Sequence, residues 1–188
     1  MICGLDSMQQ DKSRLYVEKG TPTHAFELAE KLRESDVFEC ALGGNTPMQS
    51  LISPFRYRRD NVNTYTVLKN KEVIAMFGVV SAQNNLKNGT VWFLASDKIY
   101  DNWKYFTKRT KKWTDYFLSD YDFVYNFVPK NNTTTIKWLK WLGFSFSDKE
   151  IVVRGTKVLY FYKYIQGVYK DIQPIIGDIG PQWTTDLS

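Results

Sequence analysis

Apolar and polar residues follow two different periods along this chain, and these periods predict its elements. Short apolar or alternating runs, bounded by Gly, Asn and Lys turns, are typical of strands. They fall at residues 15–17, 63–68, 72–82, 90–96, 123–128, 144–146, 150–154 and 157–164. Apolar residues at steps of three and four predict helices at 22–34 (ended by Ser35-Asp36), 47–55, 101–119 and 133–142. We predict one α/β (α+β) domain with a twisted mixed sheet of about six or seven strands and about four helices on both faces.

Segment 123–146 organises the rest of the chain, because three local signals agree within it. FVYNFV has the pattern of a buried strand, and PKNNT ends it with turn residues. Asn132 or Thr133 can accept the first free N–H groups of a helix, and Gly143 stands where a left-handed residue ends one. We therefore predict a strand, a helix and a second, half-buried strand.

Turn signals predict which strands are neighbours. The KNK sequence at 69–71 predicts a tight hairpin between the two strands that flank it. The second of these strands is apolar on both faces, so we expect residues 73–80 to lie centrally, between 65–68 and 91–95. Residues 83–89 are interpreted as a polar loop.

Both ends of the chain lack the patterns of regular structure. Residues 1–13 are interpreted as a mobile arm, and residues 14–165 contain all the predicted elements. From residue 166 Pro and Gly recur, so we expect 166–188 to be an extended tail. Its isolated apolar residues are expected to contact either this chain's own surface or a partner. They are Ile175, Ile176, Ile179 and Trp183.

Composition narrows the class of protein. The 188 residues, 43% hydrophobic and 16% aromatic, suit one aromatic-rich domain rather than a disordered chain.

Neither a signal-peptide pattern nor an apolar membrane helix is found, so we expect a soluble protein that stays inside the cell that makes it. Cys3 and Cys40 lack CxxC spacing and His neighbours, so we expect reduced, structural thiols. We expect no metal site, because no cluster of His, Cys, Asp or Glu has ligand spacing.

The formal net charge of +5 is modest, and its position matters more than its size. A basic surface is predicted on the longest helix, formed by Lys104, Lys108, Lys111 and Lys112. With the aromatic residues beside them, these lysines could bind single-stranded nucleic acid, and such binding would weaken steeply with salt. The same spacing also fits a solvated helix face beside a core face, and both interpretations stay open.

The central unit resembles a known signature. The residues that carry it are Val128, Asn132, Ile136, Leu139, Leu142, Gly143 and Phe144. They resemble the carboxy-terminal part of the Gcn5-related N-acetyltransferase (GNAT) superfamily, where an Asn opens a short helix and a Gly-Phe pair closes it. The segments DNW, YNFVPKNN and IKWLKWLGF, in a chain that also contains WFLAS, resemble the sequences of acetyltransferase-like proteins of short-tailed bacteriophages. Some of those proteins are named internal virion proteins. The resemblance covers residues 14–165.

The resemblance implies a cleft for acetyl-CoA where the sheet splays between 91–95 and 123–128. A Gly-rich turn would hold the pyrophosphate, a carboxylate or water would take the amine proton, and a Tyr would protonate the thiolate. The turn in this chain, 97–102, has no glycine, and Leu139 stands at the position of that Tyr. Tyr125 is the candidate substitute, although an aromatic residue in a strand is more often part of the core.

Four residues are the expected cofactor contacts if an acyl-CoA binds. They are Asn132, Lys98, Asp97 and Ala95. Asn132 is also explained by a helix N-cap alone. Side chains in a glycine-free turn would crowd a pyrophosphate, and the two aspartates of the turn would repel it.

Two hypotheses for function follow. In the first, the chain is a phage-encoded GNAT-fold protein with a degenerate acyl-CoA site and no cofactor. It acts in the virion or its assembly through contacts with other phage proteins, in the host cytoplasm and in the particle. In the second, it is an active N-acetyltransferase that uses acetyl-CoA to modify a host protein or a small amine. Nucleic-acid binding through the basic helix is a third alternative.

Overall fold

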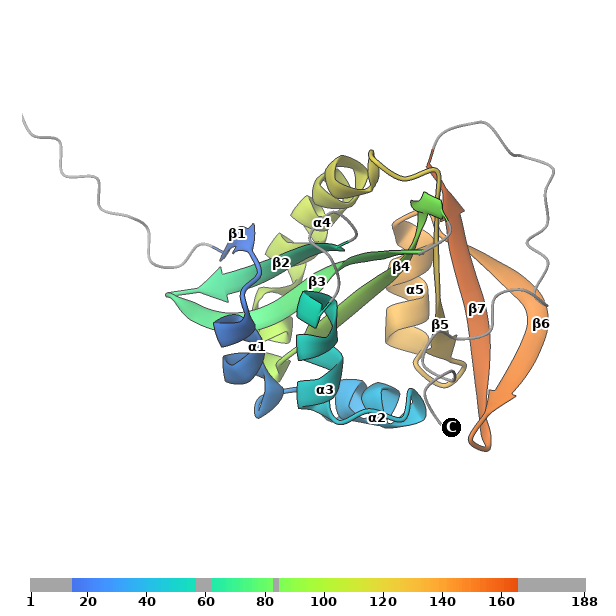
Figure 1. The fold of residues 1–188 in the computed structure, drawn as a ribbon, viewed down its shortest axis with the longest axis horizontal. Helices are drawn as coiled ribbons and strands as arrows, with labels where there is room; N and C mark the ends of the chain where they lie inside the picture. The colour runs from blue at the N-terminus through green and yellow to red at the C-terminus, as the bar shows by residue number, and fades with distance from the viewer. Residues whose placement is uncertain (1–14, 57–61, 83–84, 166–188) are drawn as a thin grey trace, which may run out of the picture.

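The strands of this chain form one seven-stranded mixed sheet in the order β1-β2-β3-β4-β5-β7-β6. The structure is a computed structural model that describes residues 15–56, 62–82 and 85–165 (Figure 1). The strands are β1 (Leu15–Lys19), β2 (Val62–Lys69), β3 (Glu72–Ala82), β4 (Asn85–Ala95), β5 (Phe123–Pro129), β6 (Ser145–Val153) and β7 (Thr156–Tyr164). Neighbouring strands are antiparallel, except that β4 and β5 are parallel. The predicted mixed sheet is confirmed.

Five α-helices in the described residues connect these strands. They are α1 (Pro22–Ala29), α2 (Glu34–Leu42), α3 (Pro47–Ile52), α4 (Trp103–Leu118) and α5 (Thr133–Trp141), with 3₁₀ turns η1 (Ser53–Arg56) and η3 (Asp97–Asn102). None of the described helices is both long and apolar enough to cross a membrane.

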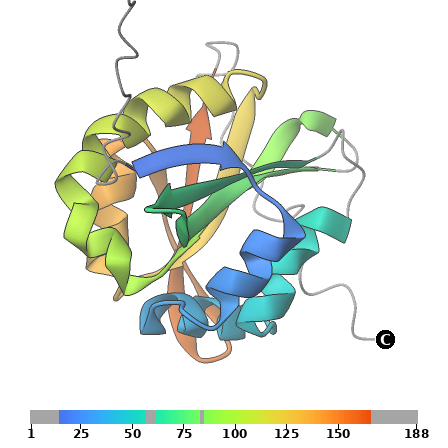
Figure 2. The ribbon, with the colours of Figure 1, turned by 90° about the vertical axis from the view of Figure 1, so that its left-hand side faces the viewer.

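The helices cover the two faces of the sheet unequally. On the β1 to β4 half, α1 and α3 pack on one face through Leu28 and Leu51, against Met76 of β3. On the opposite face, Phe106 of α4 packs against Phe77 of β3, and Leu139 of α5 packs in a cluster with β5 and β7. Figure 2 shows α4 and α5 on one side of the sheet and α1 to α3 on the other. Helices therefore lie on both faces, as predicted.

Local signals place the turns and caps where the sequence predicts them. Asn70 and Lys71 both have positive φ (52° and 68°) in the hairpin between β2 and β3. The Asn132 side chain accepts a hydrogen bond from the Thr135 backbone N–H at 3.2 Å and caps α5. Gly143 has φ +84° just after that helix, a conformation in which L side chains are strained.

Two predictions are wrong. Residues 85–89 are not a loop, because they extend β4 and pair with β3 as far as Gly89. Ser35-Asp36 does not end a helix but lies in the first turn of α2, where acidic residues suit the helix dipole. This adds a fifth α-helix to the predicted four. The helix expected at 101–119 is confirmed as α4, which starts at Trp103 after the 3₁₀ turn Asp97–Asn102.

Candidate functional site

The sheet opens between β4 and β5, as predicted. These strands pair only at the start of β5, where Phe123, Val124 and Tyr125 lie opposite residues 88–90. Beyond Thr90 they diverge, so the rest of β4 has an edge that none of the described strands covers. We call the space between the diverging strands the β4–β5 gap.

Side chains of the protein bind the peptide groups on this edge of β4. The Asn126 side chain of β5 donates a hydrogen bond to the Val91 carbonyl at 2.6 Å. The Ala95 N–H donates to a carboxylate oxygen of Asp36 at 2.6 Å, and the Ala95 carbonyl accepts from the Arg33 N–H at 2.9 Å. Ala95, a predicted cofactor contact, therefore has both of its peptide groups engaged by the residues that begin α2.

Arg33 and Asp36 form a buried ion pair at the closed end of the gap. Their side chains are 8% and 2% exposed, and the guanidinium donates to both carboxylate oxygens at 2.7–3.1 Å. The guanidinium also donates to the Tyr100 hydroxyl at 3.2 Å and lies 5.7 Å from the ring centre of Phe93. Each charge is thus compensated, which a buried ion requires.

An aromatic cluster fills the gap on the side of α4 and α5. The ring of Trp138, from α5, lies 5.2 Å from Phe93, 6.0 Å from Trp103 and 5.9 Å from Phe106, centre to centre. The cavity that remains has a volume of about 100 Å³. Pockets for small molecules measure about 300–1,000 Å³, and a water molecule takes about 30 Å³. The cavity therefore has room for a few waters rather than for a cofactor arm.

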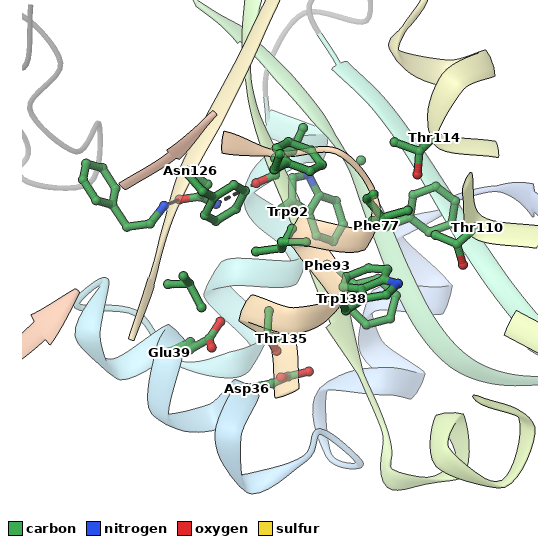
Figure 3. A pocket seen from close by; sticks show the side chains of 18 of the residues that line it. Asp36, Glu39, Phe77, Trp92, Phe93, Thr110, Thr114, Asn126, Thr135 and Trp138 are labelled. Atoms are coloured by element: carbon green, nitrogen blue, oxygen red, sulfur yellow. Dashed lines mark hydrogen bonds between the residues drawn. The ribbon is translucent and has the colours of Figure 1, made fainter. Parts of the chain in front are cut away.

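Two carboxyl groups of α2 line this cavity, Asp36 and Glu39, and Glu39 is the one not paired with Arg33. Its carboxylate accepts a hydrogen bond from the Asn132 side chain at 2.7 Å. Burial raises the pKa of Glu39 to about 7, and the hydrogen bond from Asn132 opposes that rise. Figure 3 shows Asp36, Glu39 and Thr135 on one side of the cavity and Thr110 and Thr114 on the other. A half-buried carboxyl that titrates near neutral pH can take or give a proton.

The turn that leads from β4 into α4 is built from residues with side chains. Lys98 is exposed, and its ammonium group lies 2.6 Å from a carboxylate oxygen of Glu72 on β3. Asp97 is exposed at the start of the turn, whereas Ile99 is fully buried beneath it. The one cation of this turn is thus paired within the protein.

The structure separates the predicted site residues. Asn132 faces Glu39 near the cavity. Tyr125 and its neighbour Asn126 project from opposite faces of β5, and the Tyr125 ring lies 5.9 Å from that of Tyr160. Leu139 is buried in the core. The basic surface lysines, Lys104, Lys108, Lys111 and Lys112, are all exposed on α4. The predicted partner contacts, Ile175, Ile176, Ile179 and Trp183, lie outside the described residues.

Sequence reasoning missed the residues that close the gap. Arg33, Asp36 and Glu39 recur at steps of three, which is the spacing of one helix face. That signal is hidden in the sequence, because Ser35-Asp36 also has the residue types of a helix end. Asn126 gave no signal, since only the divergence of the strands brings its amide to the Val91 carbonyl.

Two kinds of comparison place this arrangement among known proteins. The model of the family described as "Bacteriophage T7, probable scaffold protein Gp13" matches residues 59–151, just under half of the chain. No curated protein sequence matches this chain.

Similar solved structures are acetyltransferases. A GNAT-family acetyltransferase from Streptococcus pneumoniae is 14% identical with a TM-score of 0.57, covering 81% of this chain and 100% of that one. An acetyltransferase from Thermus thermophilus is 13% identical with a TM-score of 0.57, covering 80% and 96%. The aminoglycoside acetyltransferase AAC(6′)-Ib, solved with coenzyme A, is 12% identical with a TM-score of 0.56, covering 80% and 95%. The fold of this chain is the GNAT fold.

Proposed function

We propose that this chain is a phage-encoded GNAT-fold protein whose acyl-CoA site is degenerate, and that it acts as a structural or assembly protein of the virion through protein contacts. The observation that carries the proposal is that the β4–β5 gap is filled on the side of α4 and α5, where Trp138 packs against Phe93, Trp103 and Phe106. The match to a family described as a probable scaffold protein supports the assembly role.

An acyl-CoA arm does not fit the residues of this gap. To enter, it would have to move Trp138 out of three ring contacts, each worth about 0.5–1.5 kcal/mol beyond the buried area. It would also compete with Asn126 for the Val91 carbonyl. Both changes make the binding free energy of the cofactor less favourable.

The turn after β4 does not fit a pyrophosphate either. It has no glycine, so Cβ atoms stand wherever a phosphate would approach the backbone. Asp97 and Asp101 would repel the phosphates, and Lys98 is already paired with Glu72. For both reasons we derive no chemical step that uses acyl-CoA.

The proposal places the protein in the host cytoplasm during synthesis and in the particle afterwards, with other phage proteins as its partners. The test is quantitative mass spectrometry of density-purified particles of the encoding phage, compared with the lysate of infected cells. We expect a constant number of copies per particle that resists washing with high salt. A protein present in the lysate and absent from the particles and their assembly intermediates would contradict the proposal.

A second candidate function is an acetyl-CoA-dependent N-acetyltransferase that modifies a host protein or a small amine. The observation that favours it is Glu39, whose carboxyl titrates near neutral pH beside Asn132 and can accept the proton of a bound amine. The test is acetyl transfer to a panel of amines and host-cell proteins, with Glu39→Gln as the matched control. Transfer by the natural chain that the variant loses would establish this alternative.

A further inference from the structure

An aromatic ladder covers the face of β5 and β7 that lies opposite α5. It is formed by Phe123, Tyr125, Phe127, Tyr160, Tyr162 and Tyr164. Successive rings lie 4.9–6.1 Å apart across and along the two strands. Among the described residues this cluster contains strand residues alone, with no helix packed in it.

A groove runs from this ladder to α2 and α3. Its volume is about 590 Å³, several times that of the cavity in the β4–β5 gap. Tyr125, Phe127 and Val158 line one wall, and Gly43 and Ser50 from α2 and α3 line the other. Figure 1 shows α2 and α3 to the left of β5 and β7. Its ladder side is lined by apolar and aromatic residues, which suit the apolar side chains of a bound polypeptide.

The chain leaves its described part beside the ladder. The last residue of β7, Tyr164, pairs with Phe123, and the Ile165 N–H donates to the Asp122 carbonyl at 2.9 Å. Ten further residues reach at most about 33–36 Å, whereas the seven residues of β5 span about 23 Å. The apolar residues that begin at Ile175 can therefore reach any point along the ladder.

Charge at the rim of the groove complements the sequence that follows. Residues 166–188 contain three aspartates and one lysine, a net charge of −2 in a chain of +5. Arg56 lines the groove, and a Cβ added to Gly44 would lie 2.7 Å from a guanidinium nitrogen of Arg154. Both arginines are exposed, and neither has an ion-pair partner among the described residues. The acidic group in the lining is Glu39, which is hydrogen-bonded to Asn132.

One polar group in the ladder also lacks a partner. Tyr160 is 2% exposed, and its hydroxyl makes no hydrogen bond among the described residues. A buried hydroxyl without a partner is costly, and the peptide groups of a polypeptide laid along the ladder are suitable donors and acceptors.

We propose that residues 166–188 of the same chain dock into this groove, with Ile175, Ile176 and Ile179 against the ladder and the aspartates toward Arg56. Pro and Gly, which recur through this segment, keep such a segment extended rather than helical. In the free protein, the C-terminal segment thereby covers the aromatic face that no described helix covers. This inference goes beyond the assembly role and does not depend on it.

The test is photo-crosslinking in the full chain, with p-benzoylphenylalanine in place of Ile176. We expect crosslinks to peptides from residues 123–129 and 156–164, formed within one chain. A mixture of ¹⁴N- and ¹⁵N-labelled protein distinguishes links within a chain from links between chains. The matched control carries the same photoreactive residue at Trp141, which is 48% exposed on α5, and should give no crosslink to the ladder.

Three outcomes would overturn the proposal: crosslinks spread over the surface, crosslinks between chains, or no crosslink above that of the control. A second measurement uses hydrogen exchange of the full-length Ile176→Asp variant, whose substitution lies outside the described strands and helices. We expect at least a threefold faster exchange of amides in β7, with Val152→Asp, at an exposed position of β6, as the control. Equal exchange in the natural chain and the Ile176 variant would also overturn the docking.

Discussion

The two sides of the β4–β5 junction differ in how much space they leave. On the side of α4 and α5, the diverging strands are filled by Trp138 and its aromatic neighbours, and about 100 Å³ remains. On the side of α2 and α3, the same strands border a groove of about 590 Å³. The fold opens its sheet, but side chains close the opening on one side and leave it available on the other.

The difference shows how a fold can be kept while its site changes. Strand order and divergence belong to the backbone and are those of the GNAT fold. Whether a small molecule enters depends on a few side chains that fill or line the gap, and here Trp138, Asn126 and the Arg33–Asp36 pair occupy it. Function therefore has to be argued from these residues rather than from the fold.

The largest expected effect comes from breaking the ion pair at the closed end. Asp36→Ala leaves the Arg33 guanidinium buried without its carboxylate, so we expect a loss of about 3–5 kcal/mol in the free energy of unfolding. Urea unfolding followed by circular dichroism measures it. Lys31→Ala, which removes solvent-accessible pairs with Glu27 and Glu72, should change stability by less than about 0.5 kcal/mol. Equal effects of the two variants would contradict the structural role of Asp36.

Removing the aromatic filler is expected to have the next largest effect. Trp138→Ala should cost about 3 kcal/mol, because Phe93, Trp103 and Phe106 lose their shared contact. The control is Trp141→Ala, three residues along the same helix and 48% exposed, with an expected change within about 0.5 kcal/mol. We also expect the Trp138 variant not to gain affinity for acetyl-CoA, because the glycine-free turn is unchanged. Tight binding by this variant would show that Trp138 alone closes the site.

The pH dependence of stability tests the environment of Glu39. Burial raises its pKa from the ordinary 4.5 to about 7, so the folded chain binds the proton more tightly than the unfolded chain does. This contribution is fully present below about pH 4.5 and is lost as the pH rises through 7. Relative to Glu39→Gln, the natural chain should lose about 2.5 kcal/mol of stability between pH 5 and 8. Parallel stability profiles in urea titrations across that range would contradict the raised pKa.

A smaller effect is expected from removing the side-chain amide of Asn126, which bridges β5 and β4. Asn126→Leu keeps the shape of the side chain but leaves the Val91 carbonyl without a partner, so it should cost about 1–2 kcal/mol. The control is Asn131→Leu at an exposed position, which should be nearly neutral. Melting temperatures of both variants report the difference. A neutral Asn126 variant would mean that water replaces the amide and that the gap is more open than its contacts indicate.

The parts of the fold that depend on neighbours in sequence could be predicted. Asn132 caps α5 and Gly143 takes a positive φ because turn and cap chemistry is local. The hairpin at Asn70 and Lys71 and the central position of β3 follow from turn type and hydrophobic pattern. Ser35-Asp36 was misjudged because the same residue types end one helix and begin another.

For the candidate site, the sequence shows only which expected residues are missing. The missing glycines and Leu139 are visible in the sequence, but the residues that close the gap are not. Asn126 and Val91 lie 35 positions apart, and Asn132 and Glu39 lie 93 apart. Such contacts depend on strand order and on which face each side chain takes, and neither can be read from local periodicity.

Calorimetric titration of the full chain with acetyl-CoA and with CoA tests the central claim most directly. A coenzyme-A-binding acetyltransferase of the same fold serves as the positive control, and the shift in melting temperature serves as an independent readout. Because side chains fill the β4–β5 gap and the turn after β4 lacks glycine, we predict no heat of binding and no shift at millimolar ligand. Saturable binding at micromolar concentration would contradict the degenerate site and favour the acetyltransferase.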